Sequence, residues 1–118
     1  MSTSLTAVPS LLTRMSNVLT QSKDDNDRQF VTALGRGLIL LAAFEQHEQL
    51  SHQQLCQMTH LPKATVTRLI HTLLTLGFLR TTEHGQYELG SSAVRLSATA
   101  WSRSRMVESQ HDPFGSAD

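Results

Sequence analysis

The chain has 118 residues and no net charge, and 39% of its residues are hydrophobic while only 5% are aromatic. This length allows one domain with tails, whose core must be packed mainly by aliphatic side chains. The single cysteine, Cys56, excludes an intrachain disulfide and a cysteine-based zinc site, and we interpret it as a small buried hydrophobe. No apolar run approaches the ~20 residues that span a bilayer, and no secretory signal opens the chain, so we expect a soluble cytoplasmic protein with no membrane contact.

Charge is unevenly distributed along the sequence. Residues 28–105 hold eight Lys or Arg residues against four acidic residues, a net of +4, whereas acidic residues gather at 24–27 and from Glu108 onward. This mildly basic centre permits nucleic-acid binding without proving it.

Residues 1–29 are rich in polar side chains and predict a flexible N-terminal arm. Pro9 and Ser10 could start a short helix there, with an apolar stripe that docks on a partner subunit or on the domain itself. That stripe would consist of Leu11, Leu12, Met15, Val18 and Leu19. We favour a partly disordered arm with only nascent helix, and we place the domain boundary near Phe30.

A helical period over residues 31–46 predicts the first helix of the domain, with Thr32 as its N-cap. Gly35 and Gly37 each cost about 1 kcal/mol relative to Ala inside a helix. They therefore either weaken the first turn or mark a place where the helix comes close to another group. Arg36 lies between them, near the helix N-terminus and clear of the apolar stripe.

A helix-turn-helix follows. The second helix begins at Ser51, where Gln54 three residues later completes a capping box. After a tight turn, residues 62–76 predict a third helix, with Pro62 in the first helical position and Gly77 in the left-handed position beyond its end. Two short helices joined by such a turn are typical of a helix-turn-helix.

The third helix has two faces of different chemistry. Its apolar residues recur at the spacing of a buried stripe, and they are Val66, Leu69, Ile70, Leu73, Leu74 and Leu76. The opposite face carries basic groups, hydroxyls and one small residue, at Lys63, Ala64, Thr67, Arg68 and His71. A face with cations and without carboxylates can lie against a polyanion.

After Gly77 the hydrophobic period changes to two, which predicts short strands at residues 78–82 and 86–89 joined as a β-hairpin. Attached to a helix-turn-helix, this hairpin is a wing. The predicted fold class is therefore mainly α with some β (α+β): a winged helix-turn-helix over residues 30–90, with a three-helix core.

The segment after the hairpin predicts a C-terminal linker helix over residues 91–103, which Ser91 or Ser92 can cap. Its apolar face is patchy. Residues 104–118 have the composition of a disordered tail.

Three runs of the sequence carry a resemblance to a known family: A-L-G-R-G-L-I-L-L, L-P-K-A-T-V-T-R-L-I-H-T-L-L-T-L-G-F-L-R and Y-E-L-G. They resemble the N-terminal winged-helix domain of IclR-type bacterial transcription regulators, over roughly residues 30–101. The resemblance implies a dimer on pseudo-palindromic operator DNA, a recognition helix in the major groove and a wing near the backbone or minor groove. Relatives usually carry a larger C-terminal effector-binding domain, which we expect to be absent here together with any effector ligand.

Arg68 is our first candidate for DNA contact, because a guanidinium can pair with guanine O6 and N7 or clamp a phosphate. Lys63, beside the free N–H groups of the helix N-terminus, favours a phosphate. Ala64 is small enough for close approach to the bases. Thr65 and Thr67 could reach a phosphate or a thymine methyl group, although Thr65 could equally be an internal helix-start residue.

Other candidates lie further from the centre of the third helix. His71, one turn along the same face, could touch the backbone. The resemblance implies that Arg36 contacts the backbone or the minor groove, with a local ion pair as the alternative. Arg80, His84 and Gln86 on the wing are weaker candidates, since wing tips are often simply solvated.

The remaining function classes lack their signatures. The six histidines are scattered without an H-x-x-x-H pattern, so we expect no metal site and no cofactor. We expect no enzyme either, because there is no Gly-rich phosphate loop, nucleophile elbow or pair of carboxylates in an apolar setting.

The sequence therefore predicts a transcription regulator that binds specific double-stranded DNA, as a homodimer or as a heterodimer with full-length relatives. One alternative is a winged-helix protein-interaction module that uses residues 11–19 or the fourth helix. Another is a truncated competitor of full-length regulators.

Overall fold

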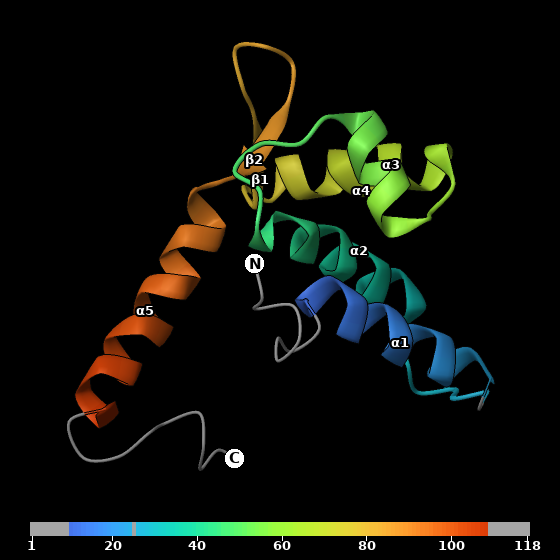
Figure 1. Ribbon diagram of the computed structural model, residues 1–118, viewed down its shortest axis with the longest axis horizontal. Coiled ribbons are helices and arrows are strands. Elements are labelled where there is room, and N and C mark those ends of the chain that lie inside the picture. Colours follow the sequence, from blue (N-terminus) through green and yellow to red (C-terminus); the bar gives the residue numbers. More distant parts are fainter. Residues whose placement is uncertain (1–9, 25, 109–118) are drawn as a thin grey trace, which may run out of the picture.

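The computed structural model describes residues 10–24 and 26–108. Within them the elements follow in the order α1 (Leu11–Asp24), α2 (Thr32–Ala42), the 3-10 turn η2 (Ala43–Glu45), α3 (His52–Thr59), α4 (Lys63–Thr75), β1 (Leu79–Thr81), β2 (Tyr87–Leu89) and α5 (Ser91–Glu108). Figure 1 shows α2, α3 and α4 gathered together, the hairpin standing out beyond α4, and α5 leading away from them. This arrangement confirms the predicted winged helix-turn-helix.

The core lies where α2, α3 and α4 meet. Leu40, Leu55 and Val66, one from each helix, are fully buried and belong to a single apolar cluster. Leu50, just before α3, is also buried and pairs with Tyr87 of β2 through two backbone hydrogen bonds of 3.0 and 2.8 Å. This bridge ties the hairpin to the helix-turn-helix, so both are fixed to one core.

Residues close in sequence determine the turn between α3 and α4. Ser51 Oγ accepts a hydrogen bond from Gln54 N (3.1 Å) and Gln54 Oε1 accepts one from Ser51 N (2.8 Å), which confirms the capping box. His60 ends α3 in the left-handed conformation, at φ 59°. Pro62 is the N-cap of α4 and not its first helical residue, because its backbone is extended (ψ 149°) while its carbonyl accepts the first helical bond from Val66 N.

The end of α4 is a tight left-handed turn. Gly77 has the predicted positive φ, 81°, and Phe78 N and Gly77 N donate back to the carbonyls of Leu73 and Leu74. The prediction that Leu76 belongs to the buried stripe is wrong. As the C-cap residue it lies beyond the last turn that packs on the core, and it is 58% exposed.

The wing is a two-stranded antiparallel hairpin. Its register pairs Leu79 with Leu89, Arg80 with Glu88, and Thr81 with Tyr87. Both strands are shorter than predicted, three residues each, because the chain between them closes through Thr82 N donating to Gln86 O and Gly85 N donating to Thr82 O.

The start of α2 differs from the prediction at its cap. Val31, not Thr32, is the N-cap and makes no side-chain cap bond, since Thr32 is already helical and the first bond runs from Gly35 N to Val31 O. A Cβ at Gly35 would lie 3.0 Å from the Phe30 ring, and one at Gly37 would lie 3.8 Å from Leu69 of α4. Gly35 therefore marks a close approach, whereas the distance at Gly37 is that of an ordinary van der Waals contact.

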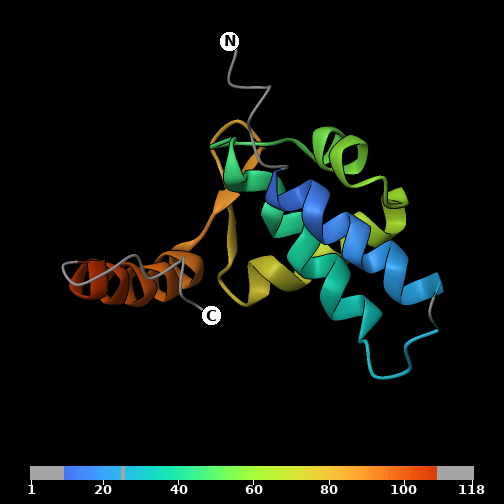
Figure 2. The same ribbon diagram turned by 60° about the horizontal axis from the view of Figure 1, so that its bottom comes forward.

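α1 lies along α2 (Figures 1 and 2). The structure therefore differs over Leu11–Asp24 from the partly disordered arm that we favoured, and it matches the alternative in which the apolar stripe docks on the domain. Leu12 packs against the core, and Leu11 N donates to Glu45 Oε1 at 2.8 Å. Residues 1–9 and 25 of that predicted arm lie outside the described residues.

α5 begins where the linker helix was predicted, at Ser91, and continues to Glu108 instead of ending at residue 103. Ser92 Oγ donates to Leu76 O at 2.8 Å and so attaches the first turn of α5 to the end of α4. The disordered tail predicted from residue 104 is thus helical to Glu108, and its remainder, 109–118, lies outside the described residues.

Candidate nucleic-acid interface

α4 turns its predicted polar face to solvent. The helix buries Val66, Ile70 and Leu73 against the core, which leaves the opposite side free. The side chains exposed there are Lys63, Ala64, Thr67, Arg68 and His71. The structure therefore brings five of the ten sequence-predicted site residues onto one continuous cationic and hydroxylated surface.

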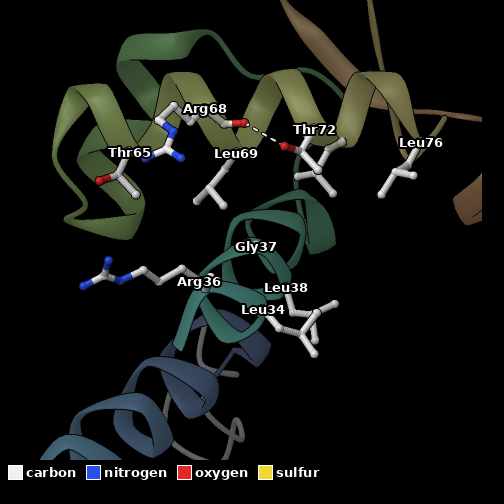
Figure 3. Close-up of a pocket in the computed structure, with 11 residues that line it drawn as sticks. Leu34, Arg36, Gly37, Leu38, Thr65, Arg68, Leu69, Thr72 and Leu76 are labelled. Atoms are coloured by element: carbon white, nitrogen blue, oxygen red, sulfur yellow. Dashed lines mark hydrogen bonds between the residues drawn. The ribbon is translucent and has the colours of Figure 1, made fainter. Parts of the chain in front are cut away.

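Thr65 lies elsewhere on the helix. It is half-buried and faces the groove between α2 and α4, together with Arg36 and Arg68. This groove has a volume of about 430 Å³. Figure 3 shows Thr65, Arg68 and Arg36 toward the N-terminal end of α4, with Leu34, Leu38 and Leu76 toward the other end. Two arginines from different helices thus line the polar end of one groove.

Arg36 extends from α2 on the side where α4 begins (Figure 3). Its Nε is buried and has no hydrogen-bond partner among the described residues. Within the same part of the chain its guanidinium forms no ion pair, which leaves the local ion-pair alternative without support. A buried N–H normally finds an acceptor, and the described residues supply none for this one.

Thr67 is linked to a residue that the sequence reasoning missed. Its Oγ1 lies 2.9 Å from Nε2 of His52, the first residue of α3, and His52 Nδ1 lies 3.6 Å from Cys56 Sγ. Cys56 is half-buried, not fully buried as interpreted. The four-residue spacing of His52 and Cys56 was a usable signal for their contact, but the link to Thr67 depends on how α3 crosses α4.

Arg80 is paired within the wing. Its Nε donates to Glu88 Oε2 across the hairpin, and Gln49 Nε2 donates to Glu88 Oε1 at 3.2 Å. The hydrogen bond from Arg80 holds the pKa of the Glu88 carboxyl below its usual value, more than partial desolvation raises it, and the bond from Gln49 lowers it further. Part of the Arg80 charge is therefore balanced within the wing.

The other two wing candidates lie in the closed loop of the hairpin. His84 is exposed, and its backbone N–H donates to Thr82 Oγ1 at 3.3 Å. Gln86 is half-buried, and its N–H donates to the same oxygen at 3.1 Å. The hairpin follows the C-terminal end of α4, so these residues are separated along the helix from Lys63 and Ala64.

Two other kinds of site are not formed by the part of the chain that the structure describes. Among the described residues, no three His, Cys, Asp or Glu side chains gather as ligands for a metal ion. None of the helices in the same residues has the length and apolar character needed to cross a membrane.

The chain is similar to known regulators over its central part. Residues 33–83 match the model of the IclR helix-turn-helix domain. The chain is 50% identical to the HTH-type transcriptional regulator TsaQ1/TsaQ2 of Comamonas testosteroni over 50 residues. These residues make up 42% of this chain and 18% of that protein. Over 53 residues, the chain is 40% identical to the Pca regulon regulatory protein of Pseudomonas putida, again 18% of that protein. The chain thus spans under a fifth of the length of these curated relatives.

Solved structures give the same result. An IclR family transcriptional regulator from Brucella abortus superposes with a TM-score of 0.60 and 44% identity, over 66% of this chain and 31% of that one. A putative IclR-family regulator from a Rhodococcus species superposes with a TM-score of 0.53 and 34% identity, over 57% and 27% of the two chains. In both cases the similarity covers the winged helix-turn-helix, which is less than a third of each of these regulators.

Proposed function

We propose that this chain, whose residues 33–83 form a helix-turn-helix domain of the IclR family, regulates transcription by binding a specific sequence of double-stranded DNA. The observation that carries the proposal is the outer face of α4. That face is exposed, cationic, hydroxylated and free of carboxylates, on a helix whose other side is anchored in the core. In this fold, such a helix enters the major groove.

The residues on that face divide between reading bases and fixing position. Arg68 is exposed on this face, where a guanidinium can pair with guanine, and Ala64 lets the helix approach closely. Lys63 opens the helix beside Pro62, an N-cap without a side-chain cap bond. The first N–H groups of α4 are therefore open to a phosphate, and Lys63 adds a positive charge to them. His71 extends the surface by one further turn.

The groove between α2 and α4 supports a second phosphate contact. Arg36 and Arg68 line its polar end with Thr65, and the buried Nε of Arg36 lacks an acceptor among the described residues. A phosphate at the mouth of the groove would pair with the terminal guanidinium nitrogens of Arg36 and Arg68. A charge-assisted hydrogen bond of this kind fixes the register of the protein on DNA without reading the sequence.

We also propose a two-fold dimer on a pseudo-palindromic operator, as a homodimer or with a full-length relative. Two recognition helices would then lie about 34 Å apart, one turn of DNA. The wing, through His84 and Gln86, would meet the adjacent backbone, with Arg80 contributing less because Glu88 holds it. The described surfaces open to a second copy include α1 and α5, which lie at the edge of the domain (Figure 1).

One observation favours a second candidate, a protein-interaction module. Leu34, Leu38 and Leu76 leave an apolar wall exposed in the same groove. A partner helix on that wall would use the leucines and leave the outer face of α4 unused. Substituting Leu34 and Leu38 would then abolish binding of that partner.

Selection of bound sequences from random double-stranded DNA, run at two salt concentrations, tests the proposal. We expect an enriched palindromic site at both concentrations, with affinity that falls as salt rises because phosphate contacts release counterions. An unenriched pool, with all binding lost at moderate salt, would leave only non-specific attraction and would favour the interaction module.

A further inference from the structure

We propose that His52 is a positioning residue that holds the Thr67 hydroxyl as a hydrogen-bond donor toward DNA. The inference rests on the proposed function, because it assumes that the outer face of α4 meets DNA. It adds a residue on α3, outside the recognition helix, to the set that determines binding.

The structure holds His52 firmly enough for this role. It is the first residue of α3, directly after Ser51, whose capping box with Gln54 fixes the backbone there. Its Nε2 lies 2.9 Å from Thr67 Oγ1, an ordinary hydrogen-bond distance. The contact joins the first turn of α3 to the exposed face of α4, across the turn between the two helices.

The neighbouring threonines show why this contact matters. A helical Thr usually donates its hydroxyl hydrogen to the carbonyl four residues earlier. In α4, Thr72 Oγ1 donates to Arg68 O at 3.1 Å and Thr75 Oγ1 donates to His71 O at 2.9 Å, so both hydroxyl hydrogens are used within the helix. Thr67 Oγ1 meets the imidazole of His52 instead.

The imidazole tautomer decides the direction of the His52–Thr67 bond, and the proposed role requires a form of His52 that carries a hydrogen on Nε2. Two of its three protonation states carry a hydrogen on Nε2: the cation and the neutral form protonated at Nε2. In that neutral form Nδ1 can accept the thiol hydrogen of Cys56, whose Sγ is 3.6 Å away. In both states His52 donates and Thr67 Oγ1 accepts, which leaves the Thr67 hydroxyl hydrogen free to point outward.

DNA offers acceptors to such a hydroxyl. Phosphate oxygens, guanine O6 and N7 and thymine O4 all accept hydrogen bonds. Lys63, one turn earlier in α4, lines the same hollow as His52, Cys56 and Thr67. The ligand class is therefore a hydrogen-bond acceptor of DNA beside a cation, either a phosphate oxygen or a base-edge acceptor.

Two variants of His52 distinguish the effect of its hydrogen bond to Thr67 from the effect of its side-chain size. In His52→Gln the side-chain amide nitrogen can take the place of Nε2 and still donate to Thr67, whereas the Asn side chain of His52→Asn is too short to do so. We expect His52→Asn to weaken operator binding about five- to tenfold and His52→Gln to stay within about twofold of the parent. Thermal unfolding of both variants gives the fraction of folded protein in each, and the measured affinities are corrected for that fraction.

Coupling to Thr67 completes the test. Thr67→Val removes the hydroxyl at nearly constant shape and should cost about as much as His52→Asn, while His52→Asn should cost nothing further in the Thr67→Val background. A loss that is uniform across DNA sequences assigns the acceptor to a phosphate. A loss of preference at one operator position assigns it to a base.

Three results would overturn the inference. His52→Asn could bind like the parent, the two losses could add in the double variant, or Thr67→Val could leave affinity unchanged. In each case the parent's selective binding would leave the proposed function intact. A parent chain without any sequence preference would overturn both.

Discussion

Replacing Gly77 by Ala should destabilise the chain more than the same replacement at Gly85, although both glycines have a left-handed backbone. Their φ angles are +81° and +78°. A non-glycine residue pays about 1–2 kcal/mol for this conformation, so both substitutions carry that cost. The surroundings differ: a Cβ at Gly85 meets nothing within 4 Å, whereas one at Gly77 would lie 2.5 Å from Ser92 Oγ.

The additional cost at Gly77 follows from what Ser92 does. Its Oγ donates to Leu76 O at 2.8 Å, which attaches α5 to the end of α4. Moving that hydroxyl away from the new methyl group would break the bond, at a net cost of about 1 kcal/mol. The free energy of unfolding should therefore fall by about 2–3 kcal/mol for Gly77→Ala and by about 1–2 kcal/mol for Gly85→Ala.

Urea unfolding followed by circular dichroism measures both values, provided that the slope with denaturant stays unchanged. A Ser92→Ala background supplies the control. There the obstructing oxygen and its hydrogen bond are already removed, so Gly77→Ala should cost no more than Gly85→Ala. The reasoning is refuted if Gly77→Ala in the parent chain costs as little as Gly85→Ala.

Two further predictions concern the core and the wing. Leu55→Ala should lower the free energy of unfolding by about 2–5 kcal/mol, because Leu55 is fully buried, whereas Leu38→Ala, at a position 46% exposed, should stay within about 0.5 kcal/mol of the parent in the same denaturant assay. An NMR titration should place the pKa of Glu88 below its usual value, with Arg80→Gln raising it. Because the folded pKa is lowered, the stabilisation that this pair contributes is present above the usual carboxyl range and is lost as pH falls through the lowered value. An unchanged Glu88 midpoint in Arg80→Gln would contradict the assigned cause.

Features that depend on residues close in sequence could be predicted. The capping box needs only Ser51 and Gln54, three residues apart, and the left-handed end of α4 needs only Gly77 after an apolar helix. The outer face of α4 follows from helical periodicity, which places Arg68 opposite the residues that the core buries. The family resemblance added the expectations of major-groove binding and of a dimer, which periodicity does not give and which stay proposals.

Features that depend on how elements pack could not be predicted. The docking of α1 requires Leu12 and the backbone of Leu11 to find the core and Glu45, more than thirty residues later. The pairing of Arg80 with Glu88 requires the register of the hairpin, and the contact of His52 with Thr67 requires the crossing of α3 over α4. Periodicity gives each helix its faces but does not say which groups meet across two elements.

Leu76 shows the same limit at a single position. Its spacing fits the buried stripe of α4, yet the helix ends one residue earlier and the side chain is exposed. At the start of the helix, Pro62 is the N-cap and not the first helical residue, so the predicted start is also one residue off. Both differences arise because the ends of a helix are decided by caps and tertiary contacts, which the period does not encode.

The most direct test of whether the outer face of α4 reads DNA is the base preference at every position of the selected operator. That preference profile is measured for the parent, Arg68→Ala and Lys63→Ala. If the outer face of α4 reads DNA, Arg68→Ala should lose about 1–3 kcal/mol at the operator and lose its preference at one position in each half-site. Lys63→Ala should keep the profile and reduce the salt slope by about 1. A profile and an affinity for Arg68→Ala that match those of the parent would show that this face of α4 does not read the sequence.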